Sequence, residues 1–258
     1  MRPQIFATCV AIAVFVSTAA AQTEPQTEPL IETQTEPQAK AAPEKYLLMK
    51  ASFDILRDEK TIWRDMFRVR RNEMKWIVPI VLANGVALYT DAAAYNKVPT
   101  SKEIQQASHA VSSLGAPYPL FIAAAAMHLV GRHTNNLRLR ETGILGTQAL
   151  VHSIIITGVL ASATNRRLPN GSGESEFWNG GRAWPSGHAT MFWALSTVVA
   201  EQYHDRPLLR FGAYSLATAV SVSRFTGGVH FPSDALASSV VGYFVGRWVV
   251  HHHSTTRE

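Results

Sequence analysis

Two short polar clusters in the C-terminal half have the residue types that phosphoryl transfer through a histidine requires. The first is Pro-Ser-Gly-His at residues 185–188, and the second contains Arg224, His230 and Asp234. One imidazole can attack phosphorus while a carboxylate orients it, and the other can protonate the leaving oxygen. Cationic and N–H groups can hold the charge on the remaining oxygens. The spacing of the second cluster predicts a catalytic set.

The separation of His230 and Asp234 by four residues favours contact between them. In a helix the two side chains would share a face, so the carboxylate could accept the Nδ1–H and leave Nε2 as nucleophile. Pro232 fits best at a helix N-terminus. We therefore expect a helix to begin near Phe231, with its positive end toward the phosphate.

The two clusters resemble the second and third signature motifs of the type 2 phosphatidic acid phosphatase / vanadium haloperoxidase superfamily, over roughly residues 144–250. The resemblance implies a helical bundle whose motif residues meet at one phosphate-sized pocket. It implies that His230 is the nucleophile, Asp234 its orienting partner and His188 the general acid. The phosphate ligands that it implies are Arg224, Ser186 and the Gly187 N–H.

The first motif of that superfamily, Lys-x6-Arg-Pro, is altered in this chain. When the motif is aligned on Pro169, the lysine falls on Ala161 and the arginine on Leu168. Arg166 and Arg167 lie just upstream, out of register, and no lysine follows residue 102. We expect one or both arginines to reach the phosphate, because a guanidinium can bind it through two donors. The alternative is a basic cap on the preceding helix.

Composition bounds the class of protein. The chain has 258 residues, 47% of them hydrophobic and 17% charged, with a net charge of +5 spread over several short segments. Aromatic residues do not interleave with the basic ones, so we expect no nucleic-acid partner. The only cysteine is Cys9, and no His, Cys and carboxylate set has a zinc spacing. We expect no metal and no cofactor.

The N-terminal third predicts export followed by a spacer. Residues 1–21 have the pattern of a secretory signal peptide cleaved near Ala21, with an uncleaved anchor helix as the alternative. Residues 22–45 repeat Thr-Glu-Pro and predict a disordered linker. Residues 46–75 predict an amphipathic basic helix, either at a membrane surface or packed on the domain. Residues 76–258 form the predicted phosphatase-like domain.

Six apolar segments predict an all-α bundle of about six core helices, embedded in a membrane. Only 144–163 reaches the ~20 residues of a membrane span. The segments are 76–90, 117–131, 144–163, 189–203, 211–222 and 235–250.

Arginine-rich linkers after the second and fourth segments favour a cytoplasmic position for those linkers, with both motif loops on the outer face. A cleaved leader conflicts with that topology. Three solutions stay open: the leader is retained, segment 76–90 does not span, or the whole domain is periplasmic.

The resulting hypothesis is a metal-independent phosphatase of the cell envelope that acts on phosphate monoesters or diphosphates of lipids or isoprenoids through a phosphohistidine. One alternative is a soluble periplasmic acid phosphatase that acts on small phosphate esters. A haloperoxidase is a more distant one, because vanadate mimics phosphate. The altered first motif favours a further alternative, a weakly active or non-catalytic lipid-phosphate-binding protein. Loop 170–184, rich in glycine and holding Trp178, Arg182 and Trp184, could be a lid or a surface loop.

Overall fold

The computed structural model describes residues 57–68, 74–98, 101–169 and 174–255. The chain divides into two units, Met1–Ser52 and Phe53–Glu258, and every described residue belongs to the second. The predicted signal peptide (1–21), the predicted linker (22–45) and the first part of the basic region lie outside the described residues.

All regular structure in the described ranges is helical, which confirms the predicted all-α bundle. Each of the six predicted apolar segments lies within or largely overlaps a helix, usually a longer one. A further helix, α4, is polar and was not predicted, and residues 57–67 are also helical. The labelled helices are α3 (Met74–Tyr95), α4 (Lys102–Ser113), α5 (Pro117–His133), α6 (Leu137–Thr164), α7 (Gly187–Gln202), α8 (Pro207–Thr226) and α9 (Pro232–His253).

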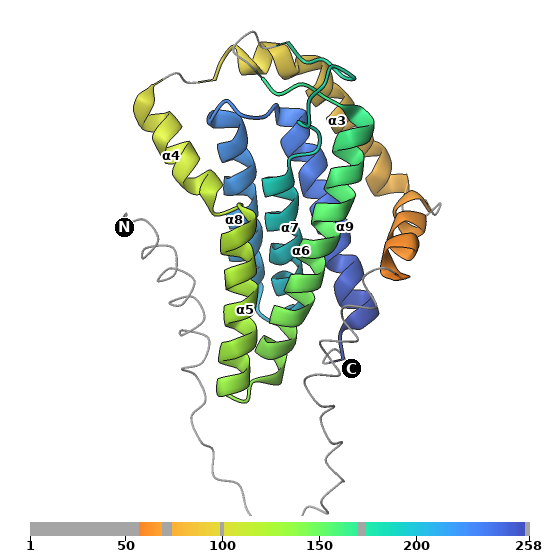
Figure 1. Cartoon of the computed structure of the whole chain (residues 1–258), viewed down its shortest axis with the longest axis vertical. Helices are drawn as coiled ribbons and strands as arrows, with labels where there is room; N and C mark the ends of the chain where they lie inside the picture. Colours follow the sequence, from red (N-terminus) through yellow and green to blue (C-terminus); the bar gives the residue numbers. More distant parts are fainter. Residues whose placement is uncertain (1–56, 69–73, 99–100, 170–173, 256–258) are drawn as a thin grey trace, which may run out of the picture. The chain divides into compact units, whose positions relative to one another are not determined.

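Helix α7 is the centre of the bundle and contacts α5, α6, α8 and α9 (Figure 1). Two glycines let α9 approach it closely. A Cβ on Gly242 would collide with the Thr190 carbonyl of α7, and one on Gly246 would collide with the Ala194 carbonyl. Valines of α7 and α9, including Val198 and Val245, fill the core beside this contact. The small residues therefore set the distance between the helices that carry the two motifs.

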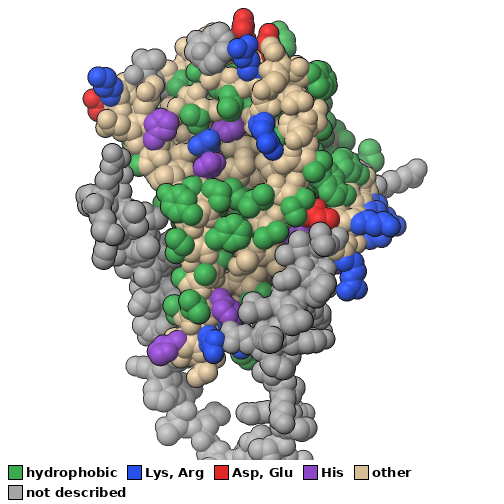
Figure 2. Space-filling view, in the orientation of Figure 1, with side chains coloured by type: hydrophobic (Ala, Val, Ile, Leu, Met, Phe, Trp, Pro, Cys, Tyr) green, Lys and Arg blue, Asp and Glu red, His purple; other side chains and the backbone are tan. Residues whose placement is uncertain are grey.

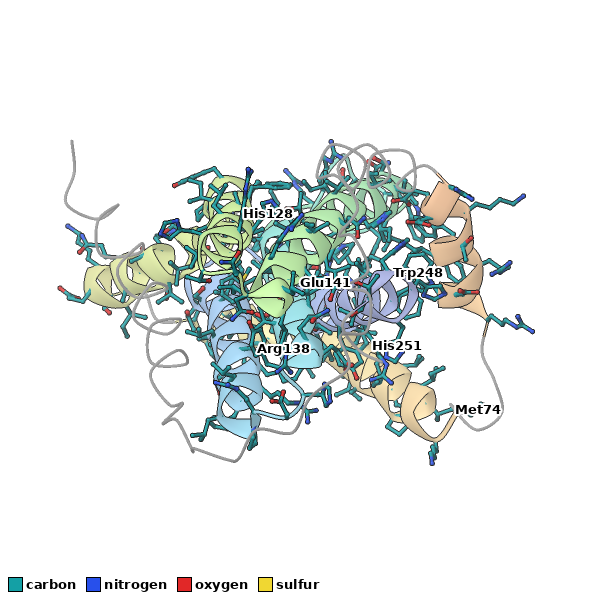
Figure 3. The ribbon with its side chains drawn as sticks, turned by 90° about the horizontal axis from the view of Figure 1, so that it is seen from below. Met74, His128, Arg138, Glu141, Trp248 and His251 are labelled. Carbon is teal, nitrogen blue, oxygen red and sulfur yellow. The ribbon has the colours of Figure 1, made fainter. Side chains whose placement is uncertain are left out.

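The chain reverses at two opposite ends of the bundle. At one end, seen from below in Figure 3, α6 begins where α7 ends: Arg138 donates to the Gln202 carbonyl at 2.6 Å and pairs with Asp205. Glu141 accepts from Gln202 at 3.2 Å at the same end. The other end, uppermost in Figure 1, holds the end of α6, the start of α7 and the α8–α9 turn. Both motifs lie there.

Two helices are long and apolar enough to cross a membrane, Ile77–Tyr95 and Leu137–Thr164. A third span is possible if α4 and α5, bent by 44°, act together. The expectation that only 144–163 reached this length was wrong, because α3 continues past residue 90 to Tyr95. Along the α3 span only 6% of the residues are buried. Figure 2 shows hydrophobic side chains across the middle of one face.

The described part of the basic region packs on the bundle. Its helix covers 57–67, and Ile62 is fully buried in the core. Glu59 lies 2.7 Å from His152 of α6, and Trp248 of α9 donates to Asp65 at 3.1 Å (Figure 3). Of the two alternatives for this region, these contacts are those of a helix packed on the domain.

Candidate active site

A tight turn after α8 places His230 beside Arg224. The N–H groups of Val229 and His230 both donate to the Arg224 carbonyl, at 3.2 and 3.1 Å. Gly228 has a φ of +70°, a conformation that glycine adopts without strain. The interval of six residues between Arg224 and His230 is thus the length of chain that reverses direction and returns to the last turn of α8.

His230 lies 3.2 Å from Asp234, measured between Nδ1 and Oδ2, and both side chains are buried. A carboxylate only accepts, so this contact favours the tautomer that has the proton on Nδ1 and the lone pair on Nε2. Helix α9 starts at Pro232 with Phe231 as its N-cap, as predicted. His230 precedes the helix, so the contact does not depend on a shared helix face. Instead, Asp234 reaches back to cap the Phe231 N–H at 2.9 Å.

Arg166 is fully buried directly behind Asp234. One guanidinium nitrogen lies 2.5 Å from Asp234 Oδ1, and another lies 2.5 Å from Asp91 Oδ2 on α3. The rings of Phe177 and Phe231 lie 4.9 and 4.5 Å from the guanidinium carbon. This position differs from the predicted one: the two carboxylates engage the terminal nitrogens expected to bind phosphate, and the buried Nε has no partner among the described residues.

The N-terminal N–H groups of α9 are also occupied by carboxylates. Ser233 donates its N–H to Asp91 at 3.1 Å, and Asp234 takes the Phe231 N–H. The expectation that the positive end of α9 would face the phosphate therefore changes, since protein carboxylates already occupy that end.

The other motif begins α7. Ser186 is the N-cap, and the helix starts at Gly187, so His188 lies within the first turn rather than before it. Ser238 of α9 donates to the Ser186 carbonyl at 3.1 Å, which ties the two motifs together. The buried Ser186 hydroxyl has no hydrogen-bond partner in the described part of the chain. The first N–H groups of a helix have no partner within it, so this turn can bind an anion.

Charged residues of the second motif change the pKa of His188. It lies outside both candidate spans, and its pKa is lowered to about 4 by burial and by the charges of Arg224 and His230. Gly115 packs against His188, and a Cβ there would lie 3.0 Å from the His188 carbonyl oxygen. The structure thus brings the predicted histidines to one site. Figure 2 shows histidine and cationic side chains gathered on the upper part of one face.

Arg224 is held by the unpredicted helix α4. Its Nη1 donates to Ser112 Oγ at 2.6 Å, while the buried Nε has no partner in the described ranges. Ser108 of α4 lies 2.7 Å from Thr226 at the end of α8, measured between the hydroxyl oxygens. α4 therefore fixes the direction of Arg224 and leaves one donor open.

The loop between α6 and α7 holds a further cation. The N–H groups of Gly181 and Ala183 donate to the carbonyls of Asn165 and Arg166, at 3.1 and 2.9 Å, so the backbone of Arg182 between them is fixed. The Arg182 guanidinium lies 3.9 Å from the Cβ position of Gly158, one helical turn before Ala161.

Arg167 occupies a different part of the same loop. It lies on the surface, 3.8 Å from Glu176, and within the described part of the chain no hydrogen bond or ion pair links it to the motif residues. The structure therefore does not bring Arg167 to the two histidines.

Sequence reasoning missed Asp91 and Ser112, and it gave Arg182 no phosphate-binding role beyond its place in loop 170–184. Asp91 had a signal, because a lone carboxylate at the end of an apolar segment marks a functional position in many membrane helices. Ser112 and Arg182 had none, since their relevance depends on how α4 and the loop fold back on the motifs.

Comparison with known proteins places these motifs in a family. Residues 143–258 match the sequence model of the PAP2 superfamily. A comparison with curated proteins gave no match. The fold is similar to that of a transmembrane PAP2-type phosphatidylglycerolphosphate phosphatase from Bacillus subtilis, with 17% identity, a TM-score of 0.53, and 70% of this chain and 98% of that one covered.

The fold is also similar to that of LpxE from Aquifex aeolicus, with 17% identity, a TM-score of 0.52, and 64% of this chain and 94% of that one covered. At this identity the two structures show similarity of fold alone. Residues 143–258, which hold both motifs, are therefore similar to the PAP2 superfamily.

Proposed function

We propose that this protein is a metal-independent phosphatase that hydrolyses phosphate monoesters or diphosphates of lipids through a phosphohistidine at His230. The observation that carries the proposal is the hydrogen bond between His230 Nδ1 and Asp234, which leaves Nε2 free as a nucleophile. Its position beside the start of α7, in the part of the chain that matches the PAP2 superfamily, supports the same reaction.

Unsatisfied donors around the histidines suit a bound phosphate. Ser186 Oγ, Trp184 Nε1 and Arg224 Nε are buried without partners in the described ranges. Buried donors without acceptors are costly, and a bound phosphate would supply the acceptors that these three lack. The N–H groups of Gly187 and His188 add the positive end of α7.

The proposed reaction has two steps. His230 Nε2 bonds to phosphorus as the P–O bond to the leaving group breaks, and His188 gives that oxygen a proton. Water then attacks the phosphohistidine, His188 takes a proton from it, and the P–N bond breaks to release phosphate. Asp234 holds Nδ1–H in both steps and stabilises the positive imidazole.

Arg182 is the group we propose in place of the altered first motif. Ala161 is buried and carries no charge, and Leu168 is exposed. Arg182 is an exposed cation one turn from Ala161, on a backbone that hydrogen bonds hold in place, and it has no carboxylate partner among the described residues. If no cation restores the lost charge, the second candidate function, lipid-phosphate binding without turnover, follows from the same site.

A lipid substrate is favoured by the surface of the bundle. The exposed apolar face of α3 and the two candidate spans suit a domain that lies in a membrane, with the site at one end. We propose an envelope membrane as the location and phosphorylated lipids as the substrates. Soluble phosphate esters are the alternative if the domain is periplasmic.

The test is hydrolysis by the protein purified in detergent, with lipid phosphates and soluble phosphate esters compared in the presence of EDTA. We expect turnover of the lipid substrates, none in His230→Ala, and an unchanged rate in His133→Ala, an exposed histidine at the far end of α5. Acid-labile phosphate should be trapped on the wild type during turnover. Wild-type turnover in His230→Ala would rule out this mechanism.

A further inference from the structure

One buried carboxylate connects α3 to the motif residues. Asp91 is fully buried, although most of α3 is exposed. Its Oδ1 accepts the Ser233 N–H at 3.1 Å, and its Oδ2 lies 2.5 Å from both Ser233 Oγ and an Arg166 nitrogen. Asp91 lies outside residues 143–258, the part of the chain that matches the superfamily.

We infer that Asp91 and Arg166 are positioning residues that fix the orientation and the charge of Asp234, and through it the direction of His230. The inference rests on the proposed function of His230. Oδ1 of Asp234 accepts a hydrogen bond from Arg166. Its Oδ2 accepts from the Phe231 N–H and contacts His230 Nδ1. With both oxygens engaged, the carboxylate cannot turn, so the imidazole that it binds keeps one orientation.

The charges of the cluster explain why a second carboxylate is needed. If Arg166 paired with Asp234 only, its positive charge would cancel the negative charge that Asp234 offers to His230. Because Asp91 shares the guanidinium, the buried group of one arginine and two aspartates retains one negative charge. That charge stabilises the positive imidazole that forms when Nε2 bonds to phosphorus. Phe177 and Phe231 cover the guanidinium and keep water from screening these interactions.

A purely structural role is the competing explanation, in which Asp91 only attaches α3 to α9. The chain offers a matched control. Asn84 joins the same two helices by donating to the Ser233 carbonyl at 3.3 Å, and it carries no charge. Asp91→Asn removes the charge and keeps the size, whereas Asn84→Ala removes a neutral tie between the helices.

We expect Asp91→Asn to lower kcat on the order of 10-fold or more, the usual effect of losing a group that orients a reacting residue. Because the phosphate donors are untouched, KM and the inhibition constant of inorganic phosphate should stay within about 2-fold. Asn84→Ala should leave kcat unchanged at equal or lower melting temperature. Equal kcat losses in the two variants, each matched by a fall in melting temperature, would overturn the inference.

Replacing Asp91 and Arg166 together by neutral residues gives a second test. Arg166→Gln leaves two buried carboxylates without a cation, which is strongly destabilising. The double variant Asp91→Asn with Arg166→Gln keeps only Asp234 charged, so we expect it to fold better and to retain more activity than Arg166→Gln. If the double variant is as inactive as the product of the single losses predicts, the residues do not act as a pair.

A readout independent of turnover separates this inference from the proposed function. Diethyl pyrocarbonate modifies neutral imidazole, and peptide mass spectrometry can follow its rate at His230 with His188 as internal reference. We expect Asp91→Asn to lower the ratio of the two rates several-fold and Asn84→Ala to leave it unchanged. If the wild type proved inactive while this ratio changed as expected, the phosphatase proposal would fail and the positioning inference would stand. An unchanged ratio would overturn the inference whatever the activity.

Discussion

The two histidines differ in what surrounds them, and the difference matches their proposed roles. His230 has a carboxylate on Nδ1, which favours a nucleophilic Nε2. His188 has no carboxylate partner among the described residues and lies near Arg224 and His230, so burial and positive charge lower its pKa to about 4. An imidazole that is neutral in the free protein needs a negative ligand beside it before it can act as an acid.

That requirement predicts proton uptake on phosphate binding. A lowered pKa favours the neutral form, so between pH 4 and 6.5 His188 is neutral where an ordinary histidine would be largely charged. The negative charge of a bound phosphate raises the pKa again. At a pH inside this window, calorimetric titration with inorganic phosphate in two buffers of different ionisation enthalpy should show protons taken up by the wild type. His188→Gln should lack the proton uptake that His188 contributes. Identical proton uptake by the wild type and this variant would contradict the role of His188.

At the residue scale, the sequence was most informative where function depends on local spacing. The positions of Arg224, His230 and Asp234 follow from one turn and one helix cap, which the motif encodes directly. The environment of Arg166 could not be read in the same way. Its partners, Asp91 and Asp234, lie far from it in the sequence, so a register argument placed it at the phosphate, whereas the packing of α3 places it behind Asp234.

At the scale of elements, the α6–α7 loop and α4 complete the site. The α6–α7 loop is fixed by backbone hydrogen bonds on both sides of Arg182, and α4 holds Arg224 through Ser112. The apolar helices were predictable because each contains a long apolar run, although most of the helices extend beyond that run. α4 was missed because it is a polar helix whose buried residues are the serines Ser108 and Ser112.

Arg182 gives a prediction for the loop. If its guanidinium binds phosphate, Arg182→Ala should raise KM about 10-fold or more, since a hydrogen bond to a charged group contributes roughly 1.5–3 kcal/mol. Steady-state kinetics with a lipid phosphate measure this, and Arg210→Ala, an exposed arginine at the opposite end, is the control. If KM rose in Arg167→Ala and stayed unchanged in Arg182→Ala, Arg167 would be the phosphate ligand, as the sequence led us to expect.

The contact between α7 and α9 gives a prediction for the helices. Gly246→Ala would force a Cβ against the Ala194 carbonyl, which should destabilise the protein by about 1–3 kcal/mol. It should also lower kcat, since α7 carries His188 and α9 follows His230. Thermal unfolding in detergent tests the first effect. Gly85→Ala is the control, because no atom lies within 4 Å of the added Cβ; a similar loss there would show that the α7–α9 contact is not the cause.

At the scale of the whole domain, the basic linkers and the site lie at opposite ends of the bundle. The linker between α5 and α6 meets the end of α7 through Arg138, which donates to Gln202 and pairs with Asp205. The motif turns lie where α6 and α8 end. Since basic linkers stay on the cytoplasmic side, this arrangement favours a site that faces outward. Among the alternatives that the leader left open, the apolar length of α3 argues against the one in which segment 76–90 does not span.

Labelling of single cysteines tests that orientation. In a background where Cys9 is replaced by serine, Asn179→Cys places a thiol in the exposed loop at the site end, and Asn135→Cys places one in the linker between α5 and α6. Positive-inside orientation predicts that a membrane-impermeant maleimide labels only the first in intact cells and both after the membrane is permeabilised. Labelling of Asn135→Cys alone in intact cells would place the site on the cytoplasmic side, where lipid phosphates of the inner leaflet become the substrates to test. Labelling of both in cells with only the outer membrane opened, together with release of the protein by carbonate, would show a periplasmic domain, and soluble phosphate esters would then be the first substrates to assay.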